Sequence, residues 1–124
     1  MAKLLVVDDE ANIRLLYAQE LSDEGHEVVT AASATEAVEK LQAGDFDLAV
    51  LDIKLKNESG IDLLQQIVKE RQTLPVILCT AFSCYKDDFS AWLADGYVVK
   101  SSDLQELKDE IARVLAKKQK AAAT

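Results

Sequence analysis

Five polar side chains stand at or just after the ends of four apolar runs of the sequence. They are Asp8, Asp9, Asp52, Thr80 and Lys100. Carboxylates brought close together repel one another, and two unit charges ~4 Å apart cost about 4 kcal/mol at an effective dielectric constant of about 20. A hard divalent cation, Mg²⁺ or Mn²⁺, offsets that repulsion and prefers oxygen ligands. The three aspartates therefore predict a cation site, provided that the fold brings them together.

These residue types also suit phosphoryl transfer. With a cation in place, one carboxylate can attack phosphorus as a nucleophile and form an acyl phosphate. The transferring phosphoryl group carries three oxygens that need positive charge or hydrogen-bond donors. The cation would contact one oxygen, the Lys100 ammonium a second and the Thr80 hydroxyl the third. The set therefore favours one phosphoryl-binding site over five unrelated loop residues.

The elements that must position these residues follow from the hydrophobic pattern. Runs rich in Val, Leu and Ile occupy residues 3–7, 27–30, 47–51, 76–80 and 97–100. Four of the five are nearly continuous in apolar residues, which is typical of strands covered on both faces. The stretches between them have helical spacing, and Ser33 with Glu36 predicts a capping box at one helix start. Gly44 is expected to end that helix.

Five strands alternating with five helices predict an α/β fold with a parallel sheet, helices on both faces and right-handed crossovers. Such sheets bind ligands at the carboxyl ends of their strands, where the five polar residues fall. We expect one domain over residues 1–118, a short C-terminal tail over residues 119–124 and no output domain.

Composition restricts the possible partners and the compartment. The chain has 14 Lys and Arg against 22 Asp and Glu, a formal charge of −8, which argues against direct binding to nucleic acid. No apolar run approaches the ~20 residues that a membrane span needs. Lys3 leads directly into a strand pattern, so we expect no signal peptide. Cys79 and Cys84 form no metal-ligand pattern and fit a reducing compartment, so a cytoplasmic protein is expected.

Four short motifs resemble those of response-regulator receiver domains, the phosphoacceptor modules of two-component signal transduction. They are Leu-Val-Val-Asp-Asp-Glu at residues 5–10, Leu-Asp-Ile at 51–53 followed by Gly60, Thr-Ala at 80–81, and Gly-Tyr-Val-Val-Lys at 96–100. They occur in the family's order over essentially the whole chain. Ser101 and Lys56 depart from the pattern, because most relatives have proline at these positions.

The resemblance implies a flavodoxin-like, doubly wound sheet, (βα)5, with strand order 2-1-3-4-5. It further implies a phosphorelay in which a histidine kinase or a phosphotransfer protein phosphorylates Asp52. Phosphorylation would then switch binding to a downstream protein. In this view the chain is a signalling phosphoacceptor rather than an enzyme, and it catalyses only its own phosphorylation and slow autodephosphorylation.

The resemblance also implies roles for individual residues. Asp9 and Asp52 would ligate Mg²⁺ together with the main-chain carbonyl of Lys54, and Asp8 would act nearby or through water. Thr80 and Lys100 would contact the phosphoryl group.

Three further side chains take roles by the same resemblance. Tyr97 would be the aromatic residue that, with Thr80, switches on activation. Lys54 and Phe82 would line the mouth of the pocket. Since neither can act as a base toward an attacking water, slow loss of the phosphoryl group is expected.

Two other classes of function compete with this interpretation. A haloacid-dehalogenase-type hydrolase also places a nucleophilic aspartate after a strand, but it needs a second acid two residues later, where this sequence has Lys54. A receiver fold can also serve as an interaction module that works without phosphorylation, because fold does not determine function.

Overall fold

The computed structural model describes residues 2–52, 54–55, 58–70, 74–80, 94–99 and 104–123. Five parallel strands form the main sheet, and four helices are found among the described residues. In chain order the elements are β1 (Lys3–Val7), α1 (Ala11–Asp23), β2 (Glu27–Ala31), α2 (Ala34–Ala43), β3 (Leu48–Leu51), β4 (Lys54–Leu55), β5 (Glu58–Ser59), α3 (Gly60–Glu70), β6 (Val76–Thr80), β7 (Gly96–Val99) and α4 (Gln105–Ala123).

The main sheet has the order β2-β1-β3-β6-β7, which confirms the expected 2-1-3-4-5 arrangement of its five strands. All four pairings are parallel. β1 pairs with both β2 and β3, and it places Val7 opposite Ala31 on one side and opposite Leu51 on the other. The central strands are thereby aligned so that the residues after Val7 and Leu51 emerge side by side at one edge.

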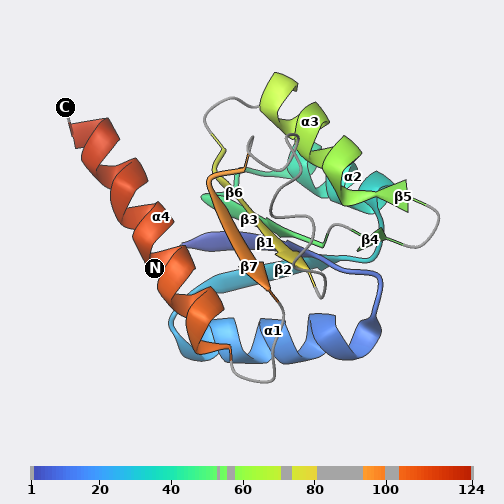
Figure 1. Ribbon diagram of the computed structural model, residues 1–124, viewed down its shortest axis with the longest axis horizontal. Helices are drawn as coiled ribbons and strands as arrows, with labels where there is room; N and C mark the ends of the chain where they lie inside the picture. Colours follow the sequence, from blue (N-terminus) through green and yellow to red (C-terminus); the bar gives the residue numbers. More distant parts are fainter. Residues whose placement is uncertain are drawn as a thin grey trace.

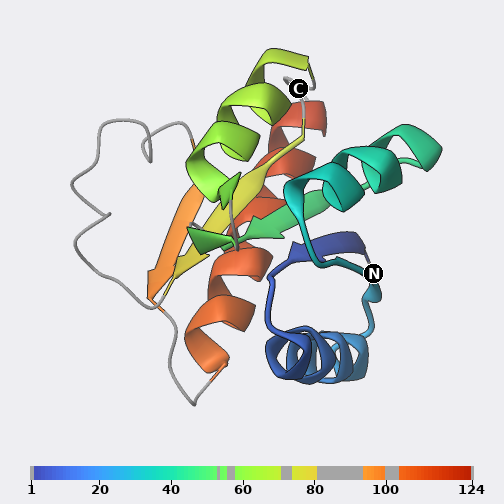
Figure 2. The same ribbon diagram turned by 90° about the vertical axis from the view of Figure 1, so that its right-hand side faces the viewer.

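The helices divide between the two faces of the sheet, α2 and α3 on one and α1 and α4 on the other (Figures 1 and 2). Side chains alternate between the two faces along each strand. In β1, Leu5 and Val7 pack in the core under α2 and α3, whereas Leu4 and Val6 pack in the core under α1 and α4. Burial on both faces explains why this strand reads as an unbroken apolar run.

Local capping contacts explain where α2 begins and where α1 ends. The Ser33 hydroxyl accepts a hydrogen bond from Glu36 N (3.1 Å), and the Glu36 carboxylate accepts one from Ala32 N (3.0 Å), so the predicted cap of α2 is confirmed. Past the end of α1, Gly25 has a φ of 94° and His26 N donates to Leu21 O (3.3 Å). This is a Schellman motif, whose left-handed residue favours glycine because it has no Cβ.

Two features were not expected from the sequence. The segment after Asp52 contains a short antiparallel pair, in which Lys54 lies opposite Ser59 and Leu55 opposite Glu58. Helix α4 runs to Ala123, through residues assigned above to the C-terminal tail.

The fourth of the five expected helices would fall between β6 and β7, in residues 81–93, which lie outside the described residues. Among the helices that are described, none combines the length and apolar character that a membrane span requires.

Candidate functional site

Three aspartates meet at the carboxyl edge of the sheet. Asp8 and Asp9 follow β1, and Asp52 follows the adjacent strand β3. Asp8 is 2% exposed and Asp52 is 7% exposed, while Asp9 is half-buried. One carboxylate oxygen from each lies within 4.8 Å of the corresponding oxygen of the other two. The sequence-predicted cluster is therefore assembled in the structure.

Main-chain hydrogen bonds extend the sheet into this site. Asp8 N donates to Ala31 O of β2 (3.1 Å), and Asp52 N donates to Val7 O of β1 (3.0 Å). These bonds continue the pattern of the parallel ladder one residue beyond the strands. The two buried aspartates therefore have backbones that are fixed by the three neighbouring strands rather than by a free loop.

The loop from β1 to α1 is held by contacts to Asp8. Its Oδ1 accepts a hydrogen bond from Glu10 N (2.9 Å), and its main-chain carbonyl accepts one from the Arg14 guanidinium (2.7 Å). Arg14 N in turn donates to Glu10 O (3.0 Å) in the first turn of α1. The sequence gives no indication of this role for Arg14, because a contact to a main-chain oxygen leaves no signature in residue spacing.

The acidic cluster fits a hard divalent cation. Mg²⁺ binds oxygens at about 2.0–2.1 Å in an octahedron, so ligand oxygens on opposite sides lie about 4 Å apart. The oxygens of Asp8, Asp9 and Asp52 are grouped on that scale. Their burial makes mutual repulsion costly in the absence of a counter-charge. Spacing, oxygen chemistry and burial therefore agree with the expected cation site.

The remaining predicted residues are only partly covered by the structure. The main chain of Lys54 lies in β4, two residues after Asp52, and Thr80 ends β6, which is the neighbour of β3. The side chains of Lys54 and Thr80 lie outside the described residues, as do Lys100 and Phe82 entirely. Their roles stay predictions.

Tyr97 is described and lies in β7 opposite Leu78 of β6. Its side chain is half-buried and packs against the core under α2 and α3. The structure thus places the expected switch residue on the edge strand, partly accessible to solvent.

A second tyrosine, Tyr17, lies beneath the acidic cluster. It is 3% exposed in the core under α1, and its hydroxyl lies 3.5 Å from Cys79 Sγ. Burial raises the pKa of Tyr17, the neighbouring Cys79 raises it further, and the charges of Asp8 and Asp52 add to the same effect. The phenol therefore stays protonated. In the sequence, Tyr17 is one of the apolar residues at helical spacing between the first two strands, and this spacing does not indicate a contact with Cys79.

Comparison with known proteins agrees with this architecture. A profile of the family described as response regulator receiver domain matches residues 4–112. The response regulator ArlR of Staphylococcus saprophyticus is 34% identical over 117 residues, which are 93% of this chain and 53% of ArlR. The two-component response regulator PhoP of Pseudomonas aeruginosa is 34% identical over 115 residues, 91% of this chain and 51% of PhoP. The chain thus spans about half the length of these curated relatives.

Solved structures give the same result. The response regulator TrrA of Thermotoga maritima, in a crystal structure with Mg²⁺–BeF, is 44% identical with a TM-score of 0.88, covering 91% of this chain and 98% of TrrA. TrrA in its complex with the histidine kinase ThkA is 44% identical with a TM-score of 0.87, covering 93% of this chain and 99% of that one. From its sequence, strand order and acidic edge, this chain belongs to the response regulator receiver domain family.

Proposed function

We propose that this domain accepts a phosphoryl group on Asp52 and that phosphorylation changes its binding to a protein partner. The observation that carries the proposal is the grouping of the Asp52 carboxylate with those of Asp8 and Asp9 at the carboxyl edge of the sheet. A nucleophilic carboxylate held next to two further carboxylates suits metal-assisted phosphoryl transfer better than any simple structural role.

Each residue has a defined part in the proposed reaction. Asp8, Asp9 and Asp52 would hold Mg²⁺ or Mn²⁺ together with the Lys54 carbonyl, and the bound cation supplies positive charge at a phosphoryl oxygen. A carboxylate oxygen of Asp52 forms the new bond to phosphorus, while the bond between phosphorus and the donor breaks and the donor leaves with its electron pair. Thr80 and Lys100 would contact the remaining phosphoryl oxygens.

The donor in this proposal is a histidine kinase or a phosphotransfer protein. The structurally similar TrrA is found in complex with the histidine kinase ThkA, which supports a kinase as partner for a domain of this shape. The domain would act as a signalling phosphoacceptor, because the acyl phosphate forms on its own side chain instead of on a released product.

Incubation with a small acyl phosphate and Mg²⁺, followed by intact-mass measurement, tests the proposal. The mass should increase by one phosphoryl group, and the label should be lost on treatment that hydrolyses acyl phosphates. Omission of Mg²⁺ should prevent the increase. A chain that gains no mass under these conditions, yet still binds a protein partner, would instead be an interaction module that works without phosphorylation.

We also propose a long phosphoryl lifetime, governed by Lys54 and Phe82, which by the family resemblance would line the mouth of the pocket. Neither side chain offers a base to a water that attacks phosphorus in line. Replacement Lys54→Asn provides an amide that can orient water, so phosphate loss should accelerate by roughly tenfold, which is about 1.4 kcal/mol of barrier. Decay of the labelled protein in Mg²⁺ after removal of the donor measures this rate. Decay of the variant at the wild-type rate would mean that other residues set the lifetime.

A further inference from the structure

Arg14 reaches from α1 back to the loop that carries the acidic pair. Its side chain is half-buried, and its Nη1 donates a hydrogen bond to the main-chain carbonyl of Asp8 at 2.7 Å. This distance is short for an N–H···O bond, as expected for a donor that carries charge. The contact joins the first turns of α1 to the end of β1.

The loop between these elements is fixed at both ends. At Asp8, the amide N–H bonds to Ala31 O, the carboxylate accepts from Glu10 N, and the carbonyl accepts from Arg14. At Glu10, the carbonyl accepts from Arg14 N. Asp9 is the single residue between Asp8 and Glu10, so the direction of its backbone follows from these contacts.

We propose that Arg14 is a positioning residue for the metal centre. By fixing the carbonyl of Asp8 it sets the course of the loop through Asp9, so that the Asp9 carboxylate stays within reach of Asp8 and Asp52. The inference rests on the cation site of the proposed function. Loss of a contact that orients a metal ligand, without touching the metal itself, typically lowers metal affinity by about 10–100-fold.

The charge of Arg14 makes the proposal easy to contradict. A guanidinium close to a cation site repels the incoming cation, so electrostatics alone predicts tighter Mg²⁺ binding when Arg14 is replaced by a neutral residue. Loss of positioning predicts the opposite, because Asp9 would then have to be ordered by the cation itself. The direction of the change in affinity therefore separates the two effects.

The test is the Mg²⁺ dissociation constant of Arg14→Met, measured by calorimetry on the unphosphorylated protein. We expect binding to weaken roughly tenfold. Arg14→Lys retains the charge and one donor that can reach the same carbonyl, so it should recover part of the loss. The urea midpoint without Mg²⁺ is measured in parallel, because an arginine that only stabilises the fold would lower this midpoint and leave the dissociation constant unchanged.

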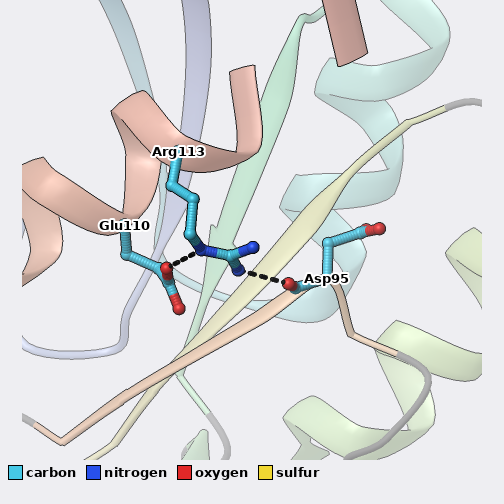
Figure 3. A network of polar contacts seen from close by, with 3 residues as sticks. All are labelled: Asp95, Glu110 and Arg113. Carbon is cyan, nitrogen blue, oxygen red and sulfur yellow. Dashed lines mark hydrogen bonds and ion pairs between the residues drawn. The ribbon is translucent and has the colours of Figure 1, made fainter. Parts of the chain in front are cut away.

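Arg113 provides a matched control. Its guanidinium donates to another main-chain carbonyl, that of Asp95, at 2.9 Å, and it also pairs with Glu110 on α4 (Figure 3). Asp95 precedes β7, so this contact lies at the amino edge of the sheet, opposite the acidic cluster. Arg113→Met removes the same charge and the same type of bond, and its Mg²⁺ affinity should equal that of the wild type.

Each outcome decides the proposal. Wild-type or tighter Mg²⁺ binding by Arg14→Met overturns it, as does an equal loss in Arg113→Met. If Arg14→Met does not fold, Arg14→Lys alone decides, with an expected loss of roughly twofold to threefold at an unchanged urea midpoint. If the wild-type protein itself binds no Mg²⁺ at millimolar concentration, the cation site of the proposed function fails together with the role of Arg14.

Discussion

Aspartates are arranged differently at the two edges of this sheet. At the amino edge, Asp47 and Asp95 each precede a strand and bond to the first residue of the neighbouring strand. Asp47 Oδ2 accepts from Lys3 N (2.8 Å) while Asp47 N donates to Lys3 O (2.8 Å). Asp95 Oδ2 accepts from Val76 N (2.9 Å) while Asp95 N donates to Val76 O (2.7 Å).

At the carboxyl edge the aspartates gather instead of spreading out. Asp8, Asp9 and Asp52 lie within 4.8 Å of one another through their carboxylate oxygens. An aspartate at the amino edge satisfies a donor that the end of a strand leaves open, and it thereby stabilises the sheet. The clustered carboxylates add mutual repulsion, which a folded protein tolerates when the site has a use. Position relative to strand direction thus separates the aspartates that bond to a strand end from those that form the proposed cation site.

The largest expected effect is on phosphorylation. Asp52→Asn should abolish acid-labile phosphorylation, because the amide is not a nucleophile that can form an acyl phosphate. Asp47→Asn should accept the label as the wild type does, since its amide oxygen still accepts from Lys3 N. Intact mass after incubation with a phosphodonor and Mg²⁺ measures both variants. A full label on Asp52→Asn would contradict the assignment of the phosphoacceptor to Asp52 at the carboxyl edge.

The second expected effect is on stability and concerns the amino edge. Asp47→Ala should lower the free energy of unfolding by about 1–2 kcal/mol, because the Lys3 amide loses its side-chain acceptor. Urea denaturation gives this value, and the Mg²⁺ response of the folded variant should be unchanged. A variant as stable as the wild type would show that water replaces the carboxylate without cost.

Mg²⁺ should stabilise the protein through the carboxyl edge only. At tenfold excess over its dissociation constant, a ligand that binds the folded state alone contributes about 1.4 kcal/mol. Asp9→Ala should lose most of this response and should be at least as stable as the wild type without Mg²⁺, because one repelling charge is gone. Thermal unfolding with and without Mg²⁺ measures both. A metal-free Asp9→Ala protein that is much less stable would assign Asp9 a structural role.

The smallest expected effect involves His26, near the amino edge. Its Nδ1 accepts a hydrogen bond from Ala2 N (3.3 Å), so the folded state needs the neutral ring. Burial lowers the pKa of His26, the positive charge of the amino terminus lowers it further, and Glu24 opposes the shift. Because the unfolded state binds the proton more readily, the stabilisation is present above pH 6.5 and is lost as the pH falls below it.

The comparison with His26→Gln isolates this effect from the titration of the carboxylates. As the pH falls from 7 to 5.5, the unfolding free energy of the wild type should decrease relative to that of the variant. Two curves that stay parallel across this range would mean that His26 is not linked to folding.

Local patterns in the sequence predicted much of this architecture. Five runs rich in Val, Leu and Ile, four of them nearly continuous, identified the five strands of the main sheet, and the spacing of Ser33 and Glu36 identified the start of α2. The strand order was predicted from the family resemblance, which also suggested the proposed role of Asp52. The gathering of Asp8, Asp9 and Asp52 followed from a general rule, because parallel strands end at a common edge.

Other features could not be predicted because they depend on contacts that residue type and spacing do not reveal. Tyr17 and Cys79 are 62 positions apart, and only packing of α1 on β6 brings the hydroxyl to the sulfur. Asp47 was expected inside a strand, whereas it precedes β3 and caps the neighbouring strand. Arg14 contacts a carbonyl, which every residue has, so residue type gave no indication of its partner.

The ladder bonds beneath the acidic cluster have a consequence for hydrogen exchange. The amide proton of Asp8 is bonded to Ala31 O of the edge strand β2, and that of Asp52 is bonded to Val7 O of β1. Exchange of the Asp8 amide with solvent requires separation of β1 from β2, and exchange of the Asp52 amide requires separation of β3 from β1; core strands open with free energies up to that of global unfolding. These two amides should therefore exchange as slowly as those of β1 itself. Any signal-dependent movement at this edge is thus left to side chains and loops, while the backbone under the carboxylates stays as rigid as the core.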